Sequence, residues 1–255
     1  MRKKTLLCYS HGLGDIIQLI PVLNYFYQQG HICDLMVRKE VISSKLLNTC
    51  PYINKLFPII NPWQSPIGKT KQEKKNCEQW KKLMKQDKYD FGMPILHHNC
   101  ITPKIDMNFV ECGIDPKGKD KSLEVFISSE NNKIGMEYIK KNYPNGYILT
   151  NSVVAAHPWH SFKHIDWIKK NLLDLPIIDI GDNCKHHIMW KDINITFVLI
   201  KEAKHLILNS SVWVHASDAL EKTIDLINYG KPDHKVWPLN QSKVLHIKEA
   251  GKFIK

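Results

Sequence analysis

Short apolar runs alternate with amphipathic segments along the first half of the chain. Runs such as TLLCY have the length of a buried strand, whereas apolar residues spaced three or four positions apart are typical of a helix. After Gly14 the apolar residues follow the helical spacing, at Ile16, Ile17, Leu19, Ile20, Leu23 and Phe26. We expect strands over residues 5–10, 32–37, 53–60 and 89–96, and helices over 15–28 and 40–50.

A second series of the same kind begins after an extended connector at residues 122–128. Its segments are a helix over 131–146, strands over 147–152 and 176–181, a helix over 166–175, apolar runs at 195–200 and 205–210, and a helix over 212–222. Alternation of strands and helices predicts parallel sheets joined by right-handed crossovers. We therefore expect an α/β protein of two doubly wound, Rossmann-like domains, residues 1–125 and 126–255, which face each other across a cleft.

The turn between the first expected strand and the first expected helix is HGLGD, which begins with His11. Gly12 and Gly14 let the backbone adopt conformations closed to other residues, and let another molecule approach closely. Asp15 stands at the helix start, where exposed N–H groups favour a carboxylate. The turn is neither a dinucleotide-binding fingerprint nor a P-loop, because a third glycine and a Gly-Lys-Ser/Thr sequence are missing. A ligand site and an ordinary capped helix both fit this pattern.

Two segments of the second half carry polar residues where a strand gives way to a helix. Their candidate phosphate-binding residues are His160, Lys163, Ser210, Ser211, His215 and Asp218. The first two lie in the loop PWHSFKH and have side chains that donate to phosphate oxygens. The serines are suited to a helix N-cap, where a phosphate would also meet backbone N–H groups. An ordinary polar loop, and a solvated charge at Asp218, are the alternatives.

The 255 residues carry a formal net charge of +11, which concentrates polyanions near the surface. The excess is uneven, because residues 69–88 hold eight lysines and three acids. A basic helix with an aromatic side chain can lie along a phosphate backbone, and the same pattern fits a solvated lid. The candidate contacts in this segment are Lys71, Lys74, Lys75, Trp80 and Lys81.

Composition and motifs argue against several classes of protein. The chain is 43% hydrophobic and 24% charged, as in soluble globular proteins, and no apolar run approaches the ~20 residues of a membrane span. The first apolar run is too short for a signal peptide, so we expect the protein in the cytoplasm, or in the host cytoplasm if its source is a virus. The seven cysteines form no C-x-x-C pair, and CKHH at residues 184–187 lacks a second ligand pair, so we expect no metal site. The sequence contains no Gly-x-Ser-x-Gly motif, so nothing in it indicates a serine hydrolase.

Three segments together resemble glycosyltransferase family 9, the ADP-heptose:lipopolysaccharide heptosyltransferase group. HGLGDIIQLIPVLNYF is similar to the opening segment of that family, with its Leu-Gly-Asp. KHIDWIKKNLLDLPIIDIGD is similar to its lysine-containing helix and the strand that follows. That strand ends here at Gly181, which is a further candidate for the donor site or the cleft. IKEAKHLILNSSVWVHASDALEK is similar to its Asp-Ser-Gly-Pro-x-His helix and the strand before it. The order of the segments, spread over both halves, carries the resemblance.

The resemblance implies the GT-B fold and an inverting, metal-independent transfer from a nucleotide-sugar. The N-terminal half would bind the acceptor and the C-terminal half the nucleotide. The catalytic aspartate of the family falls on Asp15, which would act as general base. Its phosphate-binding lysine falls on Lys163 and its histidine on His215, beside Ser211. The sequence departs from the family where an aspartate, a glycine and a proline are replaced by Ser210, Val212 and Trp213.

The acceptor is left open by these motifs. With a basic segment that contains a tryptophan in its acceptor half, the protein resembles bacteriophage enzymes that glycosylate hydroxymethylated DNA bases. A DNA acceptor is therefore our first hypothesis. A saccharide or lipopolysaccharide acceptor is the competing one. A nucleotide- or nucleic-acid-binding protein without catalysis is the third.

Overall fold

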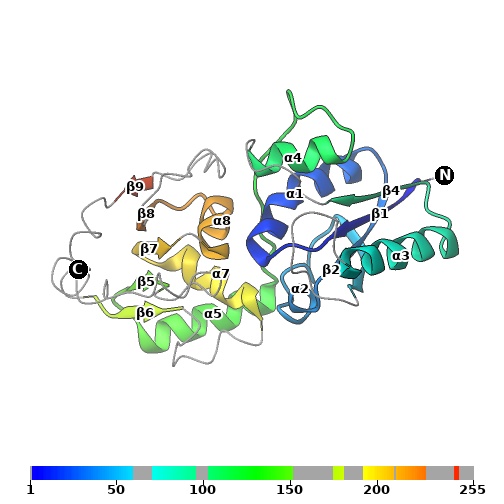
Figure 1. Ribbon diagram of the computed structural model, residues 1–255. Helices are drawn as coiled ribbons and strands as arrows, with labels where there is room; N and C mark the ends of the chain where they lie inside the picture. Colours follow the sequence, from blue (N-terminus) through cyan, green and yellow to red (C-terminus); the bar gives the residue numbers. More distant parts are fainter. Residues whose placement is uncertain are drawn as a thin grey trace. The chain divides into compact units, whose positions relative to one another are not determined.

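The computed structural model describes residues 2–59, 71–95, 103–151, 175–180, 192–209, 211–227 and 244–246. The chain divides into two compact units, the first ending at Glu124 and the second beginning at Val125. Each unit contains one parallel β-sheet (Figure 1). The expected α/β class with parallel strands is confirmed.

The first sheet has the strand order β3-β2-β1-β4. Its strands are β1 (Lys4–Tyr9), β2 (Ile32–Val37), β3 (Ile53–Pro58) and β4 (Phe91–Ile95). In β1 every residue after Lys4 is buried, as is usual for a parallel strand with helices on both faces of the sheet. Because β1 has β2 on one side and β4 on the other, the chain reverses its direction of travel across the sheet at β1.

Helices cover both faces of this sheet (Figure 1). They are α1 (Leu13–Gln28), α2 (Lys39–Ser43), α3 (Lys71–Gln86) and α4 (Lys104–Glu111). The apolar positions of α1 that the sequence assigns to one face are all buried. Helix α4 lies beside α1, and the buried amide of Asn108 on α4 donates to the backbone carbonyl of Gln18 on α1 at 2.9 Å.

The second sheet has the strand order β6-β5-β7-β8-β9. Its strands are β5 (Ile148–Thr150), β6 (Ile177–Asp179), β7 (His205–Asn209), β8 (Ile224–Ile227) and β9 (Val244–His246). The described helices of this unit are α5 (Ser129–Asn142), α7 (Ile193–Glu202) and α8 (Val212–Ala219). Helix α5 packs against α7, where Gly135 lies close to Val198.

Three elements differ from the sequence expectation or extend it. Helix α4 was not expected, and α2 covers only the first residues of the expected helix 40–50. The apolar run 195–200 lies in helix α7, and the expected helix 166–175 lies outside the described residues. Among the helices that the structure describes, none is long and apolar enough to cross a membrane.

Candidate functional site

Asp15 and Lys104 meet at the carboxyl edge of the first sheet. Helix α1 follows the end of β1, and α4 lies beyond the end of β4, so both residues stand where the strand order reverses. In open parallel sheets, ligands bind at such a switch point. The Lys104 ammonium donates to Oδ1 of Asp15 in an ion pair. Sequence reasoning placed Asp15 here and missed Lys104.

The local fold explains how Asp15 is held. Gly12 is the N-cap of α1, and its backbone N–H donates to Oδ2 of Asp15 at 3.1 Å. The carboxylate therefore lies in the first turn of α1, where the helix dipole favours a negative charge. Its side chain is 24% exposed, so a ligand can reach it.

The two glycines of this turn have ordinary backbone angles. Gly12 has φ −74° and ψ 175°, and neither Gly12 nor Gly14 has a positive φ. The turn therefore does not use the conformations closed to other residues that its glycines would allow. A Cβ at Gly12 would lie 3.7 Å from Oδ2 of Asp15, which is ordinary van der Waals contact.

His11 lies beside this ion pair as a neutral imidazole. Its side chain is 5% exposed, and its ring meets the Tyr9 ring edge-on at 4.8 Å between centroids. The pKa of His11 is lowered to about 4, mainly by burial; the charge of Asp15 opposes this shift, and the smaller effects of Lys104 and Arg38 add to it. Burial also raises the pKa of the Tyr9 phenol, and the charge of Asp15 adds to this effect. Both rings are thus uncharged near neutral pH, and His11 supplies no positive charge for a phosphate.

The second unit has an equivalent position where β5 and β7 end side by side. Ser211 is the N-cap of α8, and its Oγ accepts from the Trp213 N–H at 3.4 Å. The Asn151 amide, which directly follows β5, donates to the same Oγ at 3.3 Å. The arrangement presents the N-terminus of an eight-residue helix at the switch point of its sheet. Sequence reasoning placed Ser211 here and missed Asn151, which it counted as part of a strand.

His215 and Asp218 lie on α8 one turn apart, and both are buried, at 6% and 5% exposure. The other candidates of this half lie outside the described residues: His160, Lys163, Gly181 and Ser210. The CKHH segment lies outside them as well, and in the described part of the chain no three His, Cys, Asp or Glu side chains are grouped for a metal ion.

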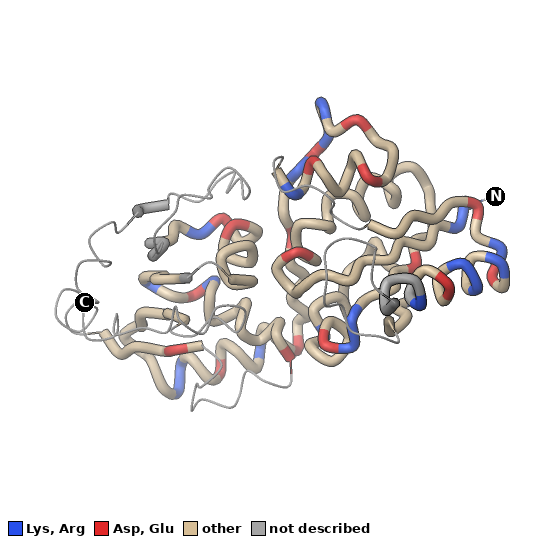
Figure 2. Tube along the Cα trace, viewed as in Figure 1, with Lys and Arg blue, Asp and Glu red and all other residues tan. Residues whose placement is uncertain are grey.

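The basic segment forms helix α3, whose two faces differ. Trp80, Leu83 and Met84 pack against buried residues of the sheet, and the Trp80 indole N–H donates to the Leu6 carbonyl at 3.3 Å. Exposed lysines lie at positions between these packed residues and on either side of them, and Figure 2 shows lysines along the helix. These are Lys75, Lys81, Lys82 and Lys85. The side chains of Lys71 and Lys74 are outside the described set. Because Trp80 packs against the sheet, the exposed lysines of α3, and not Trp80, are the candidate contacts with a partner.

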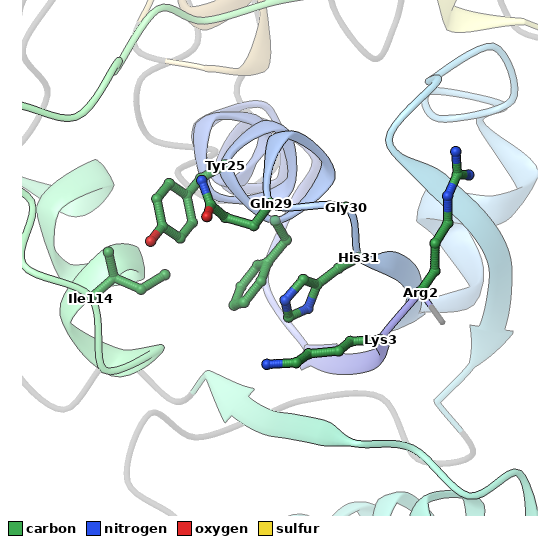
Figure 3. Close-up of a pocket in the computed structure, with 8 residues that line it drawn as sticks. Arg2, Lys3, Tyr25, Gln29, Gly30, His31 and Ile114 are labelled. Atoms are coloured by element: carbon green, nitrogen blue, oxygen red, sulfur yellow. The ribbon is translucent and has the colours of Figure 1, made fainter.

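A cavity of about 600 Å³ lies at the other edge of the first sheet, next to the residues that precede β1 and β2 (Figure 3). Figure 3 shows the Lys3 and His31 side chains on one side and Tyr25 and Ile114 on the other. His31 Nδ1 also lies 2.6 Å from the hydroxyl of Thr5. Since parallel strands begin at this edge and end at the edge of Asp15, the cavity is separate from the candidate site.

In fold, the chain is similar to solved glycosyltransferases. A family 9 glycosyl transferase from Veillonella parvula matches it with a TM-score of 0.65 at 10% identity, over 98% of this chain and 88% of that one. ADP-heptose LPS heptosyltransferase II of E. coli matches with a TM-score of 0.64 at 13% identity, over 96% and 90%. The E. coli heptosyltransferase WaaC, solved with ADP, matches with a TM-score of 0.53 at 11% identity, over 95% and 93%. No protein-family model matches the sequence, and no curated protein matches it significantly. The neighbours confirm the GT-B fold that the sequence resemblance implies.

Proposed function

We propose that the protein is an inverting glycosyltransferase, which transfers a sugar from a nucleotide-sugar to a hydroxyl group of an acceptor. The observation that carries the proposal is the placement of Asp15. It is an accessible carboxylate at the switch point of a parallel sheet, in a chain whose fold neighbours are glycosyltransferases. A general base must come within hydrogen-bond distance of the group that it deprotonates. The partly exposed carboxylate of Asp15 meets this requirement.

The proposed reaction is a single displacement. Asp15 takes the proton of the acceptor hydroxyl while that oxygen attacks the anomeric carbon of the donor. The bond from this carbon to the diphosphate breaks, and the nucleoside diphosphate leaves with the electron pair. Because attack and departure occur on opposite faces of the sugar, the anomeric configuration inverts.

We assign donor binding to the second unit. The N–H groups at the start of α8 and the Ser211 hydroxyl suit the phosphates of the leaving group. In the proposal, Lys163 offsets the charge that builds on the diphosphate, with His215 supporting the same group. This mechanism requires no metal ion, so turnover should persist in EDTA.

The test separates binding from turnover. Thermal-shift measurements with UDP-, ADP- and GDP-sugars identify the donor, because a ligand that binds the folded protein raises its Tm. Asp15→Asn should retain that shift and lose turnover, measured as release of the nucleoside diphosphate, by about 100-fold or more. The matched control is Asp106→Asn, which removes a carboxylate of α4 that pairs with Lys121 at 2.8 Å. Turnover within a few-fold of the parent in Asp15→Asn would refute the general base, and a protein that binds donors without turnover would be a binding protein instead.

We further propose that the acceptor is a hydroxymethylated base in DNA, as in bacteriophage genomes. Helix α3 supports this idea through its exposed lysines, which form a row opposite the face that packs on the sheet. Among the described side chains, the exposed acid Glu78 lies in the same row. Such a row suits the regularly spaced phosphates of a duplex. The target base would have to leave the stack to reach Asp15.

The course of α3 across the sheet fits this role. The helix runs antiparallel to the strands: Cys77 lies near Cys8 late in β1, and Trp80 bonds to Leu6 at mid-strand. Beyond the helix, Tyr89 donates to Asp34 near the start of β2. The amino end of α3 therefore lies toward the sheet edge that carries Asp15.

The salt dependence of duplex binding tests the acceptor. Log K for duplex binding falls with log salt, and each phosphate contact makes this slope steeper by about 0.9. Lys81→Glu, Lys82→Glu and Lys85→Glu together should therefore reduce the magnitude of the slope by about 2 to 3. The control makes the same charge change on exposed lysines of α5, at Lys133, Lys140 and Lys141, and should leave the slope unchanged. If the parent does not bind duplex DNA at low salt, the DNA acceptor is wrong, and a saccharide acceptor becomes the one to test.

A further inference from the structure

Lys104 occupies a position that its own helix disfavours. It is the first residue of α4, after an N-cap, Pro103, whose side chain makes no capping hydrogen bond. The helix dipole favours anions at this end, and a cation there costs about 0.3–1 kcal/mol. The acid of the same turn, Asp106, is engaged by Lys121 instead. An interaction outside α4 must therefore hold the ammonium.

That interaction is the ion pair with Asp15. The two side chains are only 20% and 24% exposed, so water screens the pair less than it screens a surface salt bridge. The buried bond from Asn108 to the Gln18 carbonyl fixes α4 against α1, one turn away from Lys104. The ammonium is thus positioned by the packing of two helices.

Other titratable groups from β1, the turn after it and the end of β2 lie near this pair. From β1 and the turn after it come Tyr9 and His11, which are uncharged near neutral pH. From the end of β2 comes Arg38, whose charge acts on His11 and whose guanidinium pairs with Glu40 at 3.3 Å. Lys104 is in direct ionic contact with Asp15.

We propose that Lys104 is a positioning residue that keeps Asp15 ionised and oriented for proton transfer. The inference deepens the proposed function and rests on it. A carboxylate can accept the proton of a hydroxyl only when it is unprotonated, and an approaching diphosphate favours its protonation by adding negative charge. The ammonium opposes that effect, and its contact with Oδ1 holds the carboxylate in one orientation.

The test measures the titration of Asp15 directly, without any substrate. Aspartate labelled with ¹³C at Cγ reports the charge of each carboxyl group, and the spectrum of Asp15→Asn identifies the signal of Asp15. In Lys104→Met the titration midpoint of Asp15 should rise by about one pH unit or more, since an opposite charge at contact distance is removed. Lys104→Arg should restore the parent midpoint. Lys121→Met, which removes the ion pair of Asp106 on the same helix, should leave it unchanged.

The outcomes distinguish this inference from the proposed function. An Asp15 midpoint in Lys104→Met equal to that of the parent overturns the role of Lys104, whatever the activity. If Lys104→Met does not fold, Lys104→Gln provides the same comparison with a polar side chain of similar length. With a donor and an acceptor that support turnover, the acid limb of the pH profile of kcat/KM should move by the same interval. A shifted midpoint together with full turnover in Asp15→Asn would refute the general base and leave the electrostatic role of Lys104 standing.

Discussion

His11 should make the stability of the first unit depend on pH in the acidic range. The imidazole is 5% exposed, and burial lowers its pKa from 6.5 to about 4. The unfolded chain binds a proton on this side chain near pH 6.5, whereas the folded protein does so only near pH 4. Between these values the unfolded state binds more protons, so stability falls as the pH falls.

The size of the effect follows from the two pKa values. The stabilising contribution is complete above about pH 7, where both states carry a neutral imidazole. Linkage gives a loss of about 2 kcal/mol by about pH 5 and of about 3 kcal/mol at about pH 4. This is a large share of the 5–15 kcal/mol that is typical of folded domains, so we expect a measurable change.

Urea unfolding of the parent and of His11→Gln, at a series of pH values, measures this contribution. Glutamine is polar and does not titrate, and the other titrating groups are common to both proteins. The difference between their free energies of unfolding should therefore change by about 2 kcal/mol between about pH 7 and about pH 5. His205→Gln removes an exposed imidazole and is the control. Parallel curves for the parent and His11→Gln would show that His11 is not held neutral by burial.

Two glycines should resist substitution because helices pack closely on them. In Gly135→Ala the new Cβ would lie 2.7 Å from Cβ of Val198, and we expect a loss of about 1–2 kcal/mol in urea unfolding, although alanine is the better helix former. Val198→Ala in the same chain should recover part of the loss, and strict additivity would contradict the clash. In Gly92→Ala the new Cβ would lie 2.8 Å from the Trp80 ring and would also meet Met84, so α3 should shift away from the sheet. We expect about 1–3 kcal/mol of destabilisation and a red shift of the indole emission, and an unchanged spectrum would contradict it.

Much of the first sheet and the place of Asp15 could be predicted because the signals are local. Strand β2 has the predicted bounds, and β1 begins and ends one residue earlier than predicted. Asp15 was placed from the turn before it and the apolar spacing after it, and both features survive in the fold as a capped helix start. Patterns of this kind depend on neighbours within one helical turn or one strand.

Helix α4 could not be predicted in this way. Its apolar residues Ile105, Met107 and Phe109 alternate with polar ones, which is the spacing of a strand. Helix α7 could not be recognised for a different reason. Its run of mostly apolar residues is buried on all sides, so the sequence shows no alternation of apolar and polar faces. Periodicity distinguishes helix from strand only when one side of the element meets water.

Lys104 could not be predicted as a site residue for a related reason. It lies 89 residues from Asp15 in the chain, and only the packing of α4 on α1 brings the two together. A lysine at the start of a helix violates the usual charge preference and is therefore a signal, but it becomes visible only after the helix itself is recognised. The residues that complete a site are often those that break a local rule, since their energetic compensation lies elsewhere in the fold.

The two switch points are filled by groups of different charge, and this difference matters for the chemistry proposed. At β1 and β4 a carboxylate is paired with an ammonium, so a fixed acceptor for a proton is present with its charge balanced. At β5 and β7 the pair is an amide and a hydroxyl, Asn151 and Ser211, at the N-terminus of α8. A neutral pair adds no negative charge to the helix end, whose partial positive charge favours an anion such as a diphosphate. A carboxylate in that place would repel the phosphates, and a neutral hydroxyl in place of Asp15 would have no basic oxygen for the proton. The same topology in each unit therefore provides an edge for ligands, and the side chains at that edge decide whether it suits proton transfer or phosphate binding.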